Sequence, residues 1–301
     1  MVGDIAGGEG VVAEPVSLEL ARAFVRAQFP EWADLPLIPF KKSGTDNQIF
    51  RLGEDKCLRF PRVDWAAETA AHEHALLKRF QGLPLDVPQP LGLGQAGEGY
   101  PWQWSVFSWV DGDALDMRRL RSDEAEGLAE TILAVRDVRA EAAFSYRTRH
   151  YGRGEPLSNR DALFQKALRE LSNEYDQASL KRIWARCLEA DEPDCKPVFL
   201  HGDLHGGNLV ERSGQVTGII DWGLAGVGDG ACDLSAAWCL MEQSVRAAFQ
   251  AAMQPTDAEW LRGAGWALSI ACTFVVHYRD KPDVDCNMSR RTITEVLEAL
   301  T

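Results

Sequence analysis

Apolar positions alternate with polar ones over short runs in the first third of the chain. Runs at 36–42, 48–52 and 56–60, separated by turns rich in Gly, Asp and Ser, predict a three-stranded antiparallel meander over 37–60. Runs at 91–94 and 103–110 predict two more strands. Two helices are expected in this part, over 17–29 with Ser17 as N-cap and over 64–80.

After residue 111 the apolar positions recur three and four apart, which is typical of amphipathic helices. Helices are expected at 122–140, 158–171, 176–190, 232–252, 256–278 and 289–300. Strand-like patterning returns only between about 195 and 222. The chain is therefore expected to be α+β and two-lobed. The first lobe, 1–110, is a small antiparallel sheet with one helix and a flexible lead-in over 1–14, and the second, 111–301, is larger and mostly helical.

Composition narrows the class of protein. With 46% apolar and 26% charged residues, the chain is expected to fold rather than stay disordered. No signal peptide is visible, and the apolar run at 268–276 is too short to span a bilayer. Seven scattered cysteines without a Cys-x-x-Cys pair predict reduced thiols in a cytoplasm. The net charge of −13 argues against nucleic acid as a partner and is compatible with a cationic substrate.

The segment 201–208, His-Gly-Asp-Leu-His-Gly-Gly-Asn, carries the chemistry, together with Ile-Asp-Trp at 220–222. Asp203 precedes Asn208 by five residues, and Asp221 follows a short strand pattern after a hairpin through 213–214. Phosphoryl transfer needs a carboxylate that orients a hydroxyl and oxygen ligands that hold Mg²⁺ on nucleotide phosphates. This order is the catalytic-loop signature of kinases. A set of unrelated turn residues is the alternative, and it does not explain the spacing.

Neighbouring polar residues are expected to support this segment. His201 and His205 stand four apart, but the glycines between them disfavour the helix that a metal pair would need. His201 is therefore expected to brace the loop, with His205 partly exposed. Asp229 is a helix N-cap candidate, and Asp233 is expected to be buried and hydrogen-bonded to 201–203.

In the first lobe, a Gly-containing turn at 43–47 lies between two strands, where backbone N–H groups can cover phosphates. Arg59 near the end of the third strand and Glu73 on the helix face are expected to form a buried ion pair, with the guanidinium reaching phosphates. The helical residues His72 and His74 are expected to be solvated.

The chain resembles the aminoglycoside phosphotransferase and choline kinase-like family, whose fold is protein-kinase-like. The matching segments are FLHGDLHGGNLV and GIIDWGLAGVGDGACDLSAAW, with weaker matches in SGTDNQIFRLG, CLRFPR, HEHALLKRF and GYPWQWSVFSWVDGDAL. The resemblance extends from about residue 35 to the C-terminus.

The resemblance implies Asp203 as catalytic base, Asn208 and Asp221 as magnesium ligands, and Arg59 with Glu73 as the phosphate clamp. His201 and Asp233 would support the site. It also implies a hinge at 107–110 and a set of nucleotide-binding residues: Ser43, Gly44, Thr45, Asn47, Ser108 and Val110. Many members have Lys at the clamp. Arg occurs there in part of the family, as in macrolide phosphotransferases.

The leading hypothesis is a Mg²⁺-dependent kinase that moves the γ-phosphoryl group of ATP to a hydroxyl of a small molecule, with an aminoglycoside-like or macrolide-like antibiotic as the named acceptor. The alternatives are a metabolic kinase acting on choline, an amino alcohol or a sugar, and a nucleotide-binding module without turnover. The missing Ala-Pro-Glu segment after Asp221 disfavours a protein kinase. GTP in place of ATP stays open. A monomer or weak homodimer is expected, with no nucleic-acid or membrane partner.

Overall fold

The computed structural model describes residues 12–40, 46–144, 152–190, 196–282 and 284–301. The chain divides into two compact units. Unit 1 comprises Met1–Gly82, Asp86–Gly112 and Gly218–Gly223. Unit 2 comprises Leu83–Leu85, Asp113–Thr217 and Leu224–Thr301. A short internal segment that carries Asp221 thus belongs to the first unit, although the sequence around it belongs to the second.

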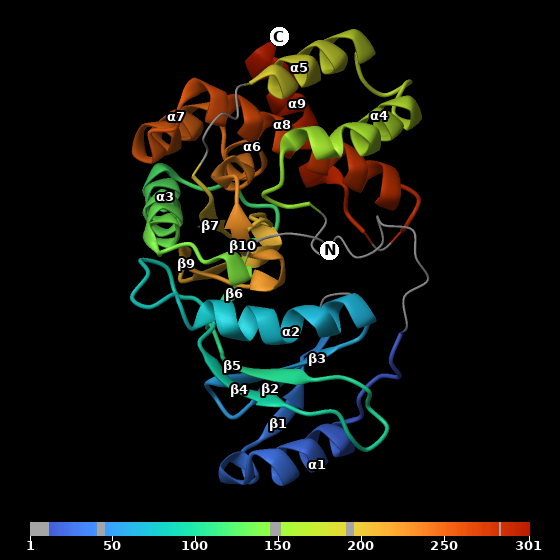
Figure 1. The fold of residues 1–301 in the computed structure, drawn as a ribbon, viewed down its shortest axis with the longest axis vertical. Helices are drawn as coiled ribbons and strands as arrows, with labels where there is room; N and C mark the ends of the chain where they lie inside the picture. The colour runs from blue at the N-terminus through green and yellow to red at the C-terminus, as the bar shows by residue number, and fades with distance from the viewer. Residues whose placement is uncertain (1–11, 41–45, 145–151, 191–195, 283) are drawn as a thin grey trace. The chain divides into compact units, whose positions relative to one another are not determined.

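Unit 1 is built on a five-stranded antiparallel sheet of order β1-β2-β3-β5-β4 (Figure 1). Its elements are α1 (Leu18–Gln28), η1 (Pro30–Trp32), β1 (Leu37–Pro39), β2 (Asn47–Leu52), β3 (Lys56–Pro61), α2 (Asp64–Leu77), β4 (Pro90–Gly94) and β5 (Trp104–Ser108). The predicted three-stranded meander is confirmed as β1, β2 and β3. The described part of the unit carries two α-helices, α1 as well as α2, because the apolar stripe over 17–29 is long enough to cover a sheet face.

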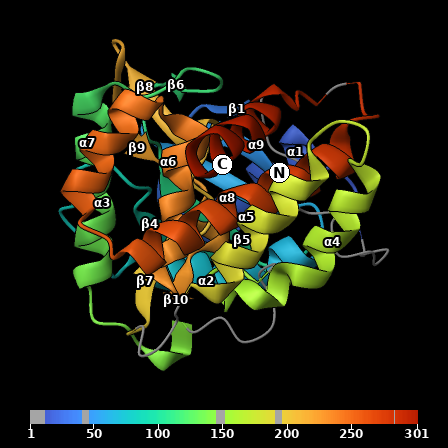
Figure 2. The ribbon, with the colours of Figure 1, turned by 90° about the horizontal axis from the view of Figure 1, so that it is seen from above.

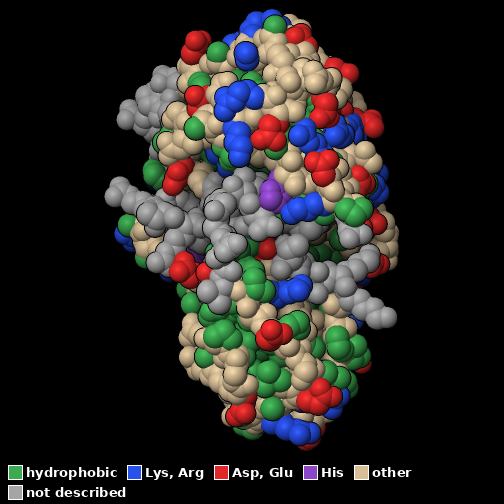
Figure 3. Space-filling view, turned by 90° about the vertical axis from the view of Figure 1, so that its right-hand side faces the viewer, with side chains coloured by type: hydrophobic (Ala, Val, Ile, Leu, Met, Phe, Trp, Pro, Cys, Tyr) green, Lys and Arg blue, Asp and Glu red, His purple; other side chains and the backbone are tan. Residues whose placement is uncertain are grey.

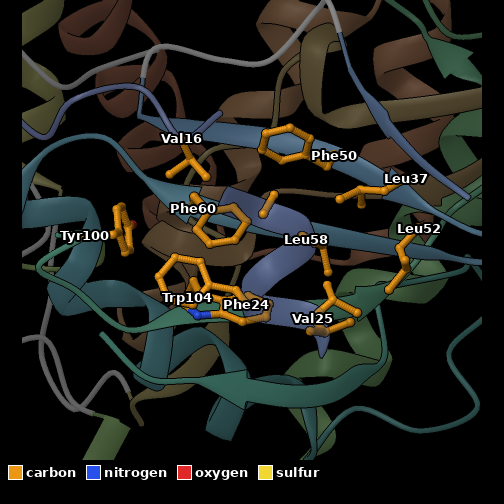
Figure 4. Close-up of a cluster of buried hydrophobic side chains, with 12 residues drawn as sticks. Val16, Phe24, Val25, Leu37, Phe50, Leu52, Leu58, Phe60, Tyr100 and Trp104 are labelled. Carbon is orange, nitrogen blue, oxygen red and sulfur yellow. The ribbon is translucent and has the colours of Figure 1, made fainter. Parts of the chain in front are cut away.

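Helix α1 covers one face of this sheet. Ser17 accepts a hydrogen bond from the Leu20 N–H at 3.1 Å, which is the predicted N-cap. Figure 4 shows Phe24 of the helix among Phe60, Trp104 and other buried side chains of the sheet. A Cβ on Gly94 would lie 2.0 Å from the Trp104 ring, so a glycine is required there. Burial of these aromatic rings removes apolar surface from water and so stabilises the unit.

Helix α2 lies on the opposite face of the sheet (Figure 1). It buries the predicted stripe, in which Glu73 is the one charged residue. The expectation that His74 is solvated is wrong: its side chain is 7% exposed and its ring lies beside Phe107. The helix turns His74 toward the sheet because it stands one position after Glu73, at the border of the buried stripe.

The lead-in is tied down at its described end. Val12 pairs with Val63, and the Ala13 N–H donates to the Arg62 carbonyl at 2.9 Å. These contacts satisfy backbone groups of the described end of the lead-in, and the flexibility expected for 1–14 stays a prediction. Residues 1–11 lie outside the described part of the chain.

Unit 2 is mostly helical. Its helices of four or more residues are η3 (Leu157–Arg160), α3 (Ser122–Asp137), α4 (Asp161–Glu170), α5 (Gln177–Glu189), η6 (Gly230–Ser235), α6 (Ala236–Leu240), α7 (Gln243–Met253), α8 (Asp257–Tyr278) and α9 (Asn287–Leu300). Helix α8 is buried along most of its length and contacts α4, α5 and α9, which Figure 2 shows gathered around it. No helix within the described ranges is long and apolar enough to cross a membrane.

Short strands frame the loops of unit 2. Strands β7 (Val198–Leu200) and β10 (Gly226–Gly228) form an antiparallel pair. Strands β6 (Asp113–Ala114), β8 (Leu209–Arg212) and β9 (Gln215–Ile219) form a second small sheet, in which the boundary between the units falls inside β9. The predicted hairpin through 213–214 is confirmed, because Ser213 and Gly214 connect β8 to β9 with φ values of +54° and +77°.

The prediction of one helix over 232–252 is wrong. The segment is divided into η6, α6 and α7, with Met241 in an extended conformation (φ −127°, ψ 146°). The Leu240 carbonyl accepts a hydrogen bond from the Leu120 N–H at 2.9 Å, and both Leu240 and Met241 are fully buried. Tertiary packing thus interrupts a pattern that is locally compatible with one continuous helix.

On the face drawn in Figure 3, basic and acidic side chains are intermixed over the described surface. No separate basic field is visible on that part of the face, in keeping with the net charge of −13.

Candidate active site

The 201–208 loop connects β7 to β8 in unit 2 and is held by a buried carboxylate. Asp233, 2% exposed, accepts hydrogen bonds from the backbone N–H groups of His201 and Gly202, each at 2.8 Å. Gly202 has φ +80°, and a Cβ there would lie 2.7 Å from the Leu224 carbonyl oxygen. The predicted contact between Asp233 and the loop is confirmed. It holds the two consecutive peptide groups that precede Asp203.

Both histidines of the loop bond to its backbone. The Nδ1 of His201 accepts from the Asp203 N–H at 3.2 Å, and the Nδ1 of His205 accepts from the Gly207 N–H at 3.1 Å. His201 is buried, whereas the His205 side chain is 27% exposed. His201 thus braces the loop as expected. Within the described ranges, no cluster of three or more His, Cys, Asp or Glu residues forms a metal site.

Asp203 is contacted on both carboxylate oxygens. Oδ1 lies 3.4 Å from Nη2 of Arg153, and Oδ2 lies 3.3 Å from Nδ2 of Asn208 and 3.5 Å from Nε2 of His205. Burial alone would raise the pKa of Asp203. The hydrogen bond from His205 and the charge of Arg153 outweigh burial and hold that pKa well below the ordinary range. The side chain is therefore a carboxylate, which accepts hydrogen bonds.

The orientation of Asn208 suits a cation. Its Nδ2 also donates to the Asp203 backbone carbonyl at 2.9 Å, which fixes the amide nitrogen toward the loop. The amide oxygen is therefore turned to the other side. An amide oxygen is a ligand type that Mg²⁺ accepts, usually together with carboxylate, water and phosphate oxygens. The donor chemistry of Asn208 thus fits a magnesium ligand.

In unit 1, Arg59 on β3 joins two carboxylates. Its Nη1 lies 2.6 Å from Oε1 of Glu73, and its Nη2 lies 2.7 Å from Oδ1 of Asp221. Oε1 of Glu73 also accepts the Trp222 N–H at 3.0 Å. Burial would lower the pKa of Arg59, but Glu73 and Asp221 raise it above its usual value. The predicted ion pair of Arg59 and Glu73 is present, and Asp221 is a third member.

Asp221 has a φ of +63°, a left-handed conformation that is uncommon for residues other than glycine, although aspartate adopts it more often than most. Such strain is often found at functional sites. The Asp221 side chain is 46% exposed, so its carboxylate can contact Arg59 with one oxygen and remain accessible to a ligand. The segment is anchored in unit 1 by Trp222, whose ring lies 5.1 Å from that of Phe80, and by the Ile219 N–H, which donates to the Asp86 carbonyl.

The other predicted nucleotide-binding residues are only partly described. Ser43, Gly44 and Thr45 lie outside the described residues. Asn47 begins β2 opposite Pro61. At the end of β5, the Ser108 N–H already donates to the Gln89 carbonyl at 2.8 Å.

Sequence analysis missed Arg153 and the contact between Arg59 and Asp221. Arg153 matches no motif, and the only local signal was its position between two glycines. The Asp221 contact joins residues 162 apart, so nothing in the local sequence indicates it.

The fold and these residues define the class of protein: an α+β chain with a protein-kinase-like fold. A family model described as the phosphotransferase enzyme family (APH) matches residues 38–267. The chain belongs to this family and is a kinase-type phosphotransferase. Comparison with curated proteins finds no match.

Solved structures with the same fold share little sequence with this chain. One, the GDP complex of wild-type aminoglycoside 2'-phosphotransferase-IIIa, aligns with a TM-score of 0.67 and 17% identity, covering 93% of this chain and 98% of that one. The GDP and kanamycin complex of APH(2")-IIIa aligns at 0.67 and 20%, covering 93% and 96%. Macrolide 2'-phosphotransferase MphH from Brachybacterium faecium, an apoenzyme, aligns at 0.61 and 18%, covering 94% and 98%.

Proposed function

We propose that this phosphotransferase moves the γ-phosphoryl group of ATP to a hydroxyl group of a small molecule, with Asp203 as the catalytic base. The observation that carries the proposal is the fixed Asp203 carboxylate, held beside Asn208 in a loop that Asp233 anchors. A structural turn residue would not need contacts on both carboxylate oxygens and a buried neighbour dedicated to its backbone.

In the proposed reaction, the acceptor oxygen forms a bond to the γ-phosphorus while the bond from that phosphorus to the bridging oxygen of ADP breaks. Asp203 accepts a hydrogen bond from the acceptor hydroxyl and directs its lone pair at the phosphorus. Because the pKa of Asp203 is low, the carboxylate first orients the hydroxyl and accepts its proton only late, as the new O–P bond forms. Asp203 then releases this proton to solvent.

Arg59 would bind the α- and β-phosphates while Glu73 holds its guanidinium in place. Asn208 and Asp221 would hold Mg²⁺, which when bound neutralises phosphate charge. The turn residues Ser43, Gly44, Thr45 and Asn47 belong to the proposed nucleotide site. Ser108 would offer its carbonyl to the base, since its N–H is used, and Val110 its backbone.

For the acceptor, we propose an aminoglycoside-like or macrolide-like compound. The support is the fold shared with a kanamycin complex and with a macrolide phosphotransferase. At 14–20% identity, however, the residues of this chain that would contact an acceptor cannot be inferred from those structures. An endogenous alcohol, such as choline, an amino alcohol or a sugar, is the second candidate. ATP is the proposed donor, with GTP to be tested beside it because the relatives include GDP complexes.

The test is an acceptor screen with ATP or GTP and Mg²⁺, read by mass detection of a phosphate adduct. Asp203→Ala is expected to abolish transfer and to leave Mg²⁺–nucleotide binding unchanged by calorimetry. An Asp203→Ala variant with full activity would exclude Asp203 as the base. Nucleotide binding without transfer to any acceptor or to water would favour a module without turnover.

A further inference from the structure

Arg153 stands in a turn that the structure builds with two glycines. Gly152 and Gly154 have φ values of +66° and +77°. A Cβ on Gly154 would lie 2.7 Å from Cδ2 of Leu200, and the Gly154 carbonyl accepts a hydrogen bond from the Asp229 N–H at 2.8 Å. The turn is therefore packed against the ends of β7 and β10, and residue 153 has one fixed place beside the loop that follows β7.

The side chain of Arg153 extends from this turn to the proposed base. A Cβ on Gly202 would lie 3.2 Å from Cβ of Arg153, so the glycine at 202 makes room for the arginine. At the other end of the side chain, Nη2 lies 3.4 Å from Oδ1 of Asp203. Two glycine positions, one in each segment, thus permit a contact between residues 50 apart in the chain.

This contact satisfies the guanidinium poorly. Arg153 is 1% exposed, and its Nε and Nη1 have no hydrogen-bond partner in the part of the chain that the structure describes. Arg262, equally buried, has Nε and Nη2 at 2.8 and 3.2 Å from the Asp229 carboxylate. A buried cation with unpaired N–H groups opposes folding. A contribution to folding stability therefore does not explain an arginine at position 153.

The two oxygens of Asp203 are held by different groups. Asn208 and His205 contact Oδ2, whereas Arg153 is the recorded side-chain contact of Oδ1 among the described residues. With Oδ2 alone held, the carboxylate can rotate about its Cβ–Cγ bond. A second contact on Oδ1 restrains that rotation, and the acceptor hydroxyl then meets an oxygen in a constant position.

We propose that Arg153 is a positioning residue for Asp203, one that holds Oδ1 at some expense in folding stability. The inference rests on the proposed function, in which Asp203 orients the acceptor hydroxyl. The proposal predicts how kcat and Tm change when the guanidinium is removed. Loss of a positioning residue lowers kcat and leaves Tm unchanged or higher, whereas loss of a stabilising residue lowers Tm.

The experiment compares Arg153→Met with Arg246→Met in the full chain. Arg246 is a matched control, a buried arginine of the same unit whose guanidinium is paired with Glu295 and stacked near Trp238. Arg153→Met is expected to lower kcat about 100-fold, with unchanged KM for nucleotide and acceptor and an unchanged or higher Tm. Arg246→Met is expected to lower Tm while kcat per folded molecule stays at the wild-type value. Arg153→Lys should restore part of kcat.

Three results would overturn the inference: wild-type kcat in Arg153→Met, a rise in acceptor KM with kcat unchanged, or a loss of Tm as large as that in Arg246→Met. The change in Tm is measured by thermal unfolding and needs no turnover. It therefore tests the role of Arg153 even if no acceptor has been identified. Failure of the proposed function has a different signature, which is the absence of transfer by the wild-type chain to any acceptor or to water.

Discussion

At the scale of single residues, the ion-pair cluster of Arg59, Glu73 and Asp221 depends on the shape of arginine. The two Nη atoms of Arg59 contact Glu73 on α2 and Asp221 in the segment 218–223, both within 2.7 Å. A planar guanidinium can hold two carboxylates with two separate nitrogens, whereas a lysine ammonium is a single point on a flexible stem. The arginine at this position is thus matched to a three-residue cluster and not to Glu73 alone.

Arg59→Lys is expected to lose one of the two contacts and to lower the free energy of unfolding by about 1.5–3 kcal/mol. Nucleotide affinity should fall with it. Chemical denaturation and calorimetric titration with Mg²⁺–ATP would measure both. Arg62→Lys, at an exposed position after the same strand, is the control and should change neither. Wild-type affinity in Arg59→Lys would show that the second contact is dispensable.

A buried neutral histidine makes unit 1 sensitive to acid. Burial lowers the pKa of His74, and the charge of Lys78 acts in the same direction. In the unfolded chain His74 binds a proton near its ordinary pKa, whereas in the folded chain burial disfavours the protonated form. Stability is therefore retained above about pH 6.5 and declines as the pH falls toward the lower folded value. His74→Leu should flatten the profile of Tm between pH 7 and 5, measured by thermal unfolding at a series of pH values. A profile as steep as that of the wild-type chain would contradict the role given to His74.

At the scale of elements, the β8–β9 hairpin depends on two residues with left-handed backbone. A Cβ added to Gly214, which has φ +77°, would have no described atom within 4 Å, so a side chain there would cost free energy only through the backbone conformation. Gly127 in α3 also has open space but lies in a helix. The same substitution should therefore have opposite effects at the two positions.

Gly214→Ala is expected to lower the free energy of unfolding by about 1–2 kcal/mol, because alanine disfavours the left-handed region. Gly127→Ala is expected to raise it by about 0.5–1 kcal/mol, because alanine restricts the unfolded chain and favours helix. Urea denaturation of both variants gives the comparison. Equal signs would contradict the assignment of the turn conformation at 213–214.

At the scale of the whole molecule, nucleotide binding is expected to raise the stability of the folded chain. A nucleotide that binds only the folded chain stabilises it by about 2.7 kcal/mol at 100 times its Kd. Tm is therefore expected to rise with ATP and Mg²⁺ and to return toward the unliganded value with EDTA. Asp203→Ala should keep the rise, whereas Arg59→Met should lose most of it. Absence of a shift with either ATP or GTP would contradict the proposed nucleotide site.

Most elements were predictable because their signals are local. The alternation over 37–60, the stripe over 64–80 and the hairpin at 213–214 depend on residues a few positions apart, and the structure confirms them. The break at Met241 and the burial of His74 were not predictable in this way, because each depends on a partner distant in the sequence. The roles of Asp203, Asn208 and Asp221 stay predictions until they are tested by mutation.

The sequence by itself determined the class of chemistry, because the order and spacing of Asp203, Asn208 and Asp221 are visible within one short segment of the chain. It also determined the α+β division of the chain through the change in apolar period. Only the tertiary structure decided that Arg59 holds Asp221 as well as Glu73, and that Arg153 reaches Asp203. These contacts join residues 162 and 50 positions apart. Local pattern carries no information at such distances, because packing alone brings the partners together.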